Sequence, residues 1–212
     1  STINASTSTA AVTLDLSTYD PTTSLVVTDG QADDTITNVS ADADNLLTTI
    51  NLSSGGSDVI NYTNTFNTGT NSELTINNFT SGAGAGADKL VITTGAAQTA
   101  GFTTIGAANA VVPLINQVYE ITSTVASVTD FTVVADGGAV EVAINTALNG
   151  VTLTAVASTV IVYGAGANAG KAGIYSVTDT AAALATTAFG IELIGVLDLS
   201  GGADSLVLSN FI

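Results

Sequence analysis

A short phrase that occurs twice most constrains what this chain can fold into. Gly86-Ala87-Asp88-Lys89-Leu90-Val91-Ile92 returns almost unchanged as Gly202-Ala203-Asp204-Ser205-Leu206-Val207-Leu208, and a looser copy reads Gly56-Ser57-Asp58-Val59-Ile60. In each copy, glycine permits a tight turn, aspartate offers a carboxylate at the bend, and an apolar run then favours a buried strand. We therefore interpret this Gly-x-Asp-strand unit as the building element of a mainly β protein.

Short apolar segments and turn clusters alternate from about residue 12 to residue 94. Val12, Leu14 and Leu16 alternate with polar residues, which is typical of a half-buried strand. Later apolar peaks recur at irregular intervals of roughly ten to sixteen residues, a spacing that indicates a sandwich, a barrel or a solenoid. The irregularity favours a distorted β-solenoid or β-sandwich. Asn77-Asn78, with neighbouring Ser and Thr, is expected to form polar ladders on the turns.

The chain is expected to divide into an N-terminal arm and strand (1–20), a Gly/Asp-turn β domain (21–95) and a C-terminal β-rich domain (111–212). A linker rich in Ala, Gly and Thr is expected over 95–110. Within the last domain, Val140, Ile144 and Leu148 are spaced four apart, which predicts a helix over 138–148 that ends at Asn149-Gly150. A second short helix is expected over 180–187. Strands are expected at 118–121, 131–134, 160–163, 173–177, 191–197 and 206–208.

The charge balance is strongly acidic. The 212 residues include 18 Asp and Glu against two lysines, giving a formal net charge of −16. Such a chain has almost nothing with which to neutralise phosphate, which argues against nucleic acid and anionic membrane as partners. It attracts cations instead, and bound cations would relieve the repulsion among its acids.

Two kinds of segment are missing from the sequence pattern. No run of 18 or more apolar, uncharged residues appears, so no transmembrane segment is expected. The first residues also lack the basic and apolar stretches of a secretory signal peptide. The alternatives are a mature product, a fragment, or a protein exported by a C-terminal signal.

Catalytic equipment is sparse. Without His or Cys, neither a Ser-His-Asp nor a Cys-His arrangement can form, and zinc loses its usual ligands. Carboxylate pairs remain, as in glycosidases, but the spacing of Glu73, Glu120, Glu141 and Glu192 selects no pair. We therefore expect that the chain is not an enzyme.

Calcium is the expected cofactor, because bent Gly/Asp loops supply the carboxylate and carbonyl oxygens that it takes. The candidate ligands are Asp29, Asp33, Asp34, Asp42, Asp44, Asp58, Asp88 and Asp204. The alternative is that Asp follows Gly because both residues favour turns and Asp hydrogen-bonds its own backbone.

Two groups of residues resemble a known family. Gly55-Gly56-Ser57-Asp58-Val59 and Gly201-Gly202-Ala203-Asp204-Ser205-Leu206 resemble compressed RTX nonapeptide repeats, whose pattern is Gly-Gly-x-Gly-x-Asp-apolar. The stretch from Val160 to the end looks like the C-terminal domains of RTX-type bacterial surface proteins, the S-layer and adhesin class, which type I secretion exports. The resemblance implies a C-terminal export signal, calcium binding and an extracellular or cell-surface location.

These observations favour a structural, self-assembling extracellular protein, such as an S-layer or filament subunit. Its partner would be copies of itself, joined through strand edges, with Val12, Leu14 and Leu16 as candidate assembly residues that complete a neighbour's sheet. The alternative is an export, anchoring and binding module of a large secreted adhesin. A cell-surface glycan is a further candidate partner.

Overall fold

The computed structural model describes residues 1–17, 24–40, 48–53, 55–63, 74–93, 101–108, 118–134, 138–148, 158–179 and 189–211. Over these residues the protein is mainly β, as the sequence predicts, with strands in two sheets, an α-helix and two short 3-10 helices.

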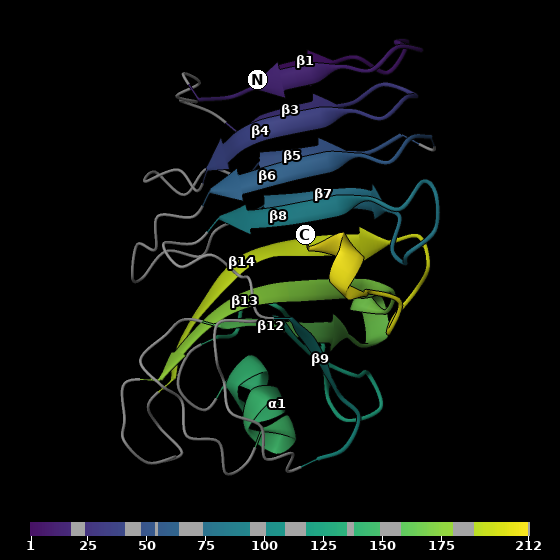
Figure 1. The fold of residues 1–212 in the computed structure, drawn as a ribbon. Helices are drawn as coiled ribbons and strands as arrows, with labels where there is room; N and C mark the ends of the chain where they lie inside the picture. The colour runs from purple at the N-terminus through teal and green to yellow at the C-terminus, as the bar shows by residue number, and fades with distance from the viewer. Residues whose placement is uncertain are drawn as a thin grey trace.

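One large sheet extends through the described chain, and a smaller sheet faces part of it (Figure 1). The spatial order of the large sheet is β1-β3-β5-β7-β14-β13-β12-β10-β9, with β11 beside β12. Its strands are β1 (Thr2–Asn4), β3 (Leu25–Thr28), β5 (Thr48–Asn51), β7 (Leu74–Phe79), β9 (Phe102–Ile105), β10 (Val118–Ile121), β11 (Ser127–Val128), β12 (Ser158–Gly164), β13 (Lys171–Asp179) and β14 (Phe189–Leu199). The smaller sheet contains β2 (Thr13–Asp15), β4 (Thr35–Ser40), β6 (Val59–Thr63) and β8 (Lys89–Thr93), in that order.

Successive strands up to β8 alternate between the two sheets. We call each consecutive pair a rung: β1 with β2, β3 with β4, β5 with β6, and β7 with β8. Neighbouring rungs pair in parallel in both sheets. The inward positions form two aliphatic columns, Ile3, Val27, Ile50 and Ile76 on one sheet and Leu14, Ile36, Ile60 and Leu90 on the other. Burial of these columns between the sheets supplies the main driving force for stacking the rungs.

A polar ladder follows the ends of the strands in the large sheet. The Asn77 side-chain amide donates to Asn51 Oδ1 at 2.7 Å, and the Asn51 amide donates to Thr28 Oγ1 at 3.5 Å. The main chain continues the same stacking, because Leu52 N donates to Asn77 O at 3.1 Å. A ladder forms at Asn77, but it joins residues within β3, β5 and β7 and does not lie on the turns as predicted.

The C-terminal part of the chain joins the large sheet through β14. This strand pairs in parallel with β7, where Leu197 lies opposite Ile76, and in antiparallel fashion with β13. Gly195 makes the close approach possible: a Cβ at this residue would lie 2.7 Å from Leu74 O and 3.0 Å from Leu74 Cβ.

The helix α1 (Ala139–Ala147) lies at the lower end of the view in Figure 1. It covers the face of the C-terminal strands that carries Val162 and Tyr175. Its buried Val140 and Ile144, together with Leu148, belong to a hydrophobic cluster that includes Val162 and Tyr175. The predicted helix over 138–148 is therefore confirmed. Two 3-10 helices, η1 (Gly166–Asn168) and η2 (Leu208–Asn210), complete the described elements.

Several predicted local structures differ from those observed. The predicted N-terminal arm contains β1, and the predicted linker contains β9. Both segments form strands because they pair with neighbouring strands, β3 and β10, of the large sheet. The strand predicted over 131–134 is a turn, since the Asp130 carboxylate accepts bonds from both N and Oγ1 of Thr132. The strand predicted over 206–208 is also wrong, because this segment leads into η2. The helix predicted over 180–187 lies outside the described residues.

Candidate metal centre

Three buried aspartates occupy equivalent places in successive rungs. Asp34, Asp58 and Asp88 each stand directly before a strand of the smaller sheet, and each is only 2% exposed. Each carboxylate accepts the main-chain N–H at the equivalent position of the preceding rung. The donors are Val12 at 2.6 Å for Asp34, Asp34 at 2.8 Å for Asp58, and Asp58 at 3.0 Å for Asp88. These aspartates thus connect neighbouring rungs by hydrogen bonds from side chain to main chain.

The second carboxylate oxygen closes the loop that precedes the strand. Asp34 Oδ2 accepts from Gly30 N at 2.5 Å, and Asp88 Oδ2 accepts from Thr80 N at 2.7 Å. Hydrogen bonds from main-chain N–H groups to a carboxylate are charge-assisted and roughly twice as strong as neutral ones. Aspartate at this position therefore fixes both the turn and the start of the next strand.

A fourth buried aspartate, Asp29, lies beside Asp34 and Asp58 and forms a cluster with them. Asp29 follows β3 directly, and its Oδ1 accepts from Ser53 N at 2.6 Å. Oxygen atoms of Asp29, Asp34 and Asp58 all lie within 4.8 Å of one another. Asp29 is 3% exposed, and its Oδ2 has no hydrogen-bond partner among the residues that the structure describes. Three buried acids with an unmatched oxygen can hold a cation or share protons.

Burial and mutual repulsion disturb the acidity of this cluster. Burial raises the pKa of Asp58 to about 7, and the nearby Asp29 and Asp88 carboxylates add to the increase. Burial likewise raises the pKa of Asp29 to about 6, with repulsion from Asp34 as a further contribution. The hydrogen bonds donated to these carboxylates oppose the increase but do not cancel it.

A small cavity lies between the first two rungs and touches the cluster. Its volume is about 30 Å³, and its lining includes Asp29 and Asp34 together with Ile3, Val12 and Leu14. This volume can accommodate a water molecule, which needs about 10–15 Å³ on the same measure. The accessible surface of the cavity is apolar, however, so a water molecule there would lack the polar partners that hold a buried water.

The remaining candidate ligands are placed differently. Asp33 is exposed, and its Oδ1 accepts from Ser57 N at 2.9 Å. Asp88 continues the ladder beyond the cluster. Asp204 is exposed at a positive φ of 58° and accepts from Ser123 N at 2.7 Å, so the two near-identical phrases have different structures. Asp42 and Asp44 lie outside the described residues.

Sequence reasoning did not single out Asn210. Its side chain is fully buried at the C-terminal end, where the amide donates to Asp88 O at 2.8 Å. Its Oδ1 accepts from Gly82 N at 3.1 Å and from Val207 N at 3.0 Å. No local pattern marks this role, because two of the three partners, Asp88 and Gly82, lie more than a hundred residues away in the chain.

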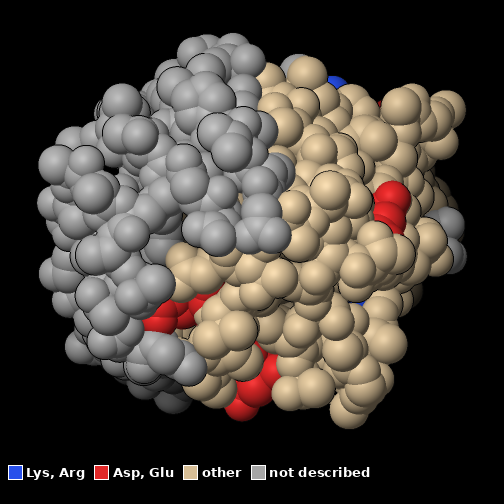
Figure 2. All heavy atoms as spheres, turned by 90° about the horizontal axis from the view of Figure 1, so that it is seen from below, with Lys and Arg blue, Asp and Glu red and all other residues tan. Residues whose placement is uncertain are grey.

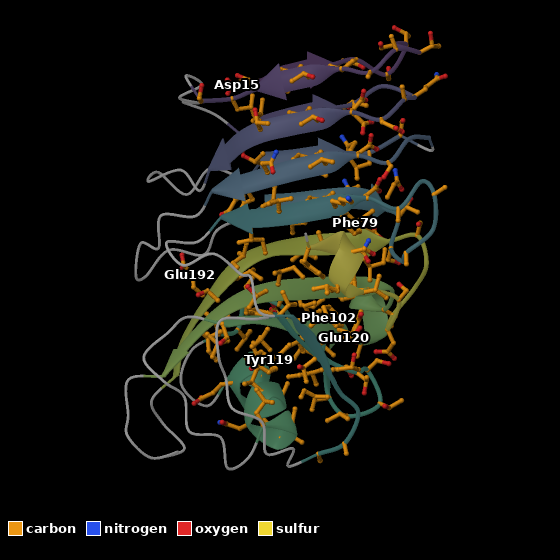
Figure 3. The ribbon with its side chains drawn as sticks, in the orientation of Figure 1. Asp15, Phe79, Phe102, Tyr119, Glu120 and Glu192 are labelled. Atoms are coloured by element: carbon orange, nitrogen blue, oxygen red, sulfur yellow. The ribbon has the colours of Figure 1, made fainter. Side chains whose placement is uncertain are left out.

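The glutamates that the structure describes do not gather into a second site, and Glu73 lies outside the described residues. Figure 3 shows Asp15, Glu120 and Glu192 in separate parts of the molecule. Glu120 is 3% exposed; its carboxylate accepts from Tyr163 Oη at 2.6 Å and from Thr104 Oγ1 at 3.0 Å. Burial raises the pKa of Glu120, and these two bonds oppose that effect. The two hydrogen bonds of Glu120 therefore connect β9, β10 and β12 of the large sheet.

Comparisons with protein-family models, with curated proteins and with solved structures find no significant match to this chain. Among the helices that the structure describes, none combines the length and the apolar character needed to cross a bilayer.

Proposed function

We propose that this chain is a structural extracellular protein that associates with copies of itself through the strand edges of its first rung. In this proposal residues 1–93 form a two-sheet solenoid, and calcium stabilises it. The observation that carries the proposal is that, among the described residues, β1 and β2 end their sheets at the first rung while β9 ends the large sheet at its opposite edge, so that the edge of one copy can pair with the other edge of the next without closing.

The first rung presents hydrogen-bonding groups to a neighbouring molecule. Ser1 O accepts from Val26 N at 2.9 Å, and Ala5 N donates to Thr28 O at 2.8 Å. Because main-chain groups alternate sides along a strand, those of the intervening Thr2 face away from β3. The same alternation applies in β2, where Val12 O accepts from Thr35 N and the groups of Thr13 face outward. An exposed edge of this kind can pair with another chain.

Edge pairing requires less rearrangement than strand exchange. In the structure, β2 pairs with β4 of its own chain, Leu16 is 7% exposed, and Val12 N is bound to Asp34. Exchange through Val12, Leu14 and Leu16 would first have to break these contacts. Addition of a neighbour to the open edge leaves them intact.

Composition and surface character support an extracellular structural role. The chain has no cysteine and only 9% charged residues. Figure 2 shows that the described part of one face is largely uncharged, with a few acidic side chains. The net charge of −16 opposes contact between copies, so divalent cations that neutralise the acids would favour association.

The test is sedimentation of a variant whose outward edge donors are removed. Thr2→Pro combined with Thr13→Pro deletes N–H groups that face away from the protein's own sheets, because proline has no N–H. We expect the wild-type chain to form polymers in calcium and the double variant to stay monomeric with an unchanged circular dichroism spectrum. Thr9→Pro, outside the strands of the same segment, is the matched control and should polymerise.

Two results would contradict the proposal. One is a double variant that polymerises as the wild type does. The other is a wild-type chain that stays monomeric at all concentrations; affinity of that monomer for a cell-surface glycan would then favour the binding-module alternative.

A further inference from the structure

The cluster of Asp29, Asp34 and Asp58 contains an electrostatic imbalance that the protein itself does not correct. All three side chains are at least 97% buried, and they present oxygen atoms within 4.8 Å of one another. The chain has no arginine, and neither of its two lysines is among the groups that set the pKa of Asp29 or Asp58. Buried carboxylates without a positive partner are costly, so a group from solution is needed to balance them.

Asp29 Oδ2 shows where that group would bind. Main-chain N–H groups hold one oxygen of Asp29, one of Asp58 and both of Asp34. Oδ2 of Asp29 is buried and has no partner among the described residues. In native proteins an unmatched buried polar atom is rare, and a bound ion or water is one of its standard explanations. A carboxylate oxygen that already accepts one hydrogen bond still has a lone pair for a metal.

We propose that Asp29, Asp34 and Asp58 bind one divalent cation of the calcium type and that this ion holds the first rung in place. Calcium accepts irregular sets of carboxylate, carbonyl and water oxygens, whereas magnesium demands near-ideal octahedral geometry and dehydrates reluctantly. Zinc and copper prefer nitrogen and sulfur ligands, and no His or Cys exists in the chain.

The ion would act across three rungs. Asp29 and Asp34 belong to the second rung, and Asp58 belongs to the third. Asp34 also holds Val12 N at 2.6 Å, directly before β2 of the first rung. An ion that fixes the Asp34 carboxylate therefore fixes the edge strand at the open end. The effect on self-association rests on the function proposed above, whereas ion binding itself does not.

The experiment compares calcium binding and calcium-induced stabilisation in the full chain and in single Asp→Asn variants. After chelation, calcium is titrated by calorimetry, and thermal unfolding is recorded with and without calcium. We expect Asp58→Asn and Asp29→Asn each to bind one ion fewer than the wild type. Asp33→Asn, which removes the same charge from an exposed residue of the same loop, is the matched control and should retain that ion.

Thermal unfolding distinguishes a role of Asp58 in binding the ion from a role in the stability of the fold alone. At calcium concentrations about a hundred times Kd, the wild type and Asp33→Asn should gain roughly 5–10 °C in Tm. Asp58→Asn should lose most of this gain and yet be at least as stable as the wild type in chelator, because an amide relieves the repulsion with Asp29. Hydrogen exchange at Val12 N should slow with calcium in the wild type only.

The proposal is overturned if Asp58→Asn keeps both the wild-type ion count and the wild-type calcium-dependent gain in Tm. It is equally overturned if the wild type binds no calcium, in which case protons alone balance the cluster. Sedimentation of the same samples distinguishes the two proposals. Ion binding without polymers would refute the proposed function but not the site, and polymers without ion binding would refute the site alone.

Discussion

The side-chain amide of Asn210 occupies the place of a strand that the smaller sheet does not have. It donates to Asp88 O at 2.8 Å. In the preceding rungs the equivalent carbonyls accept main-chain bonds: Asp58 O from Lys89 N at 2.8 Å, and Asp34 O from Val59 N at 2.9 Å. The C-terminal tail therefore ends the stack of rungs at β8 with a side chain that imitates the next strand.

Asn210→Ala should destabilise the protein by about 2–4 kcal/mol, because it leaves Asp88 O and two main-chain N–H groups without their buried partner. Urea unfolding followed by circular dichroism measures this change. Ser209→Ala is the control, since its hydroxyl makes only a long 3.4 Å bond to Gly82 O, and it should cost less than about 0.5 kcal/mol. Equal free energies of unfolding for the two variants would show that Asn210 is not a cap.

Gly56→Ala should be more damaging than Gly82→Ala, although both glycines have positive φ, 98° and 109°. A Cβ at Gly56 would collide with the main-chain carbonyl of Ala32, whereas a Cβ at Gly82 meets nothing within 4 Å. We expect a loss of about 1 kcal/mol for Gly82→Ala from backbone strain alone, and roughly twice that or more for Gly56→Ala. Chemical denaturation of both variants tests the difference, and similar losses would contradict the observed packing of the loops.

Gly195→Val should weaken the connection between the N-terminal rungs and the C-terminal strands. The added side chain would collide with Leu74 where β14 meets β7. Because this pairing joins the two halves of the large sheet, we expect thermal unfolding to broaden or to split into two transitions. Gly84→Ala, where a Cβ meets nothing, should unfold as the wild type does. A single, unshifted transition in Gly195→Val would refute this role for the glycine.

In chelator, stability should rise as the pH falls from 8 to 5. The folded-state pKa values of Asp58 and Asp29 are about 7 and about 6, above their ordinary value of 3.8. The folded state therefore binds protons more tightly than the unfolded state. The contribution of these two groups to stability is greatest below pH 4 and is lost as the pH rises through 6 and 7. We expect Tm to increase by several degrees over this interval.

Asp58→Asn separates the cluster from the general repulsion among acids, which also weakens at low pH. The variant should show a smaller pH dependence of Tm than the wild type, and Asp33→Asn should not. Identical pH profiles in the wild type and Asp58→Asn would mean that the cluster does not titrate in this range.

Local patterns in the sequence predicted several elements because their side chains carry a clear period. Alternation around Leu14 marks β2, and the four-residue spacing of Val140, Ile144 and Leu148 marks α1. The parallel register of the rungs is harder to predict from the sequence, because loops of different length separate the residues that pair. β1 and β9 have no strong period of their own and become strands because neighbouring strands offer partners.

The candidate site was recognisable only in part. Asp29, Asp34 and Asp58 are among the predicted ligands, but of these three the Gly-x-Asp unit contains only Asp58. The signal that Asp34, Asp58 and Asp88 share is an aspartate placed directly before an apolar strand. Asp204 carries the same local pattern without forming a strand, and Asp29, which follows β3, carries no such pattern. The contribution of Asn210 depends on a contact between the two ends of the chain, which no local pattern reveals.

Electron microscopy of the purified chain, first in calcium and then after chelation, tests the central claim most directly. We expect ordered arrays or fibres in calcium, because the ion fixes the first rung and its open edge pairs with another copy. These assemblies should disperse when the ion is removed. Single particles of unchanged size in both conditions would contradict the account.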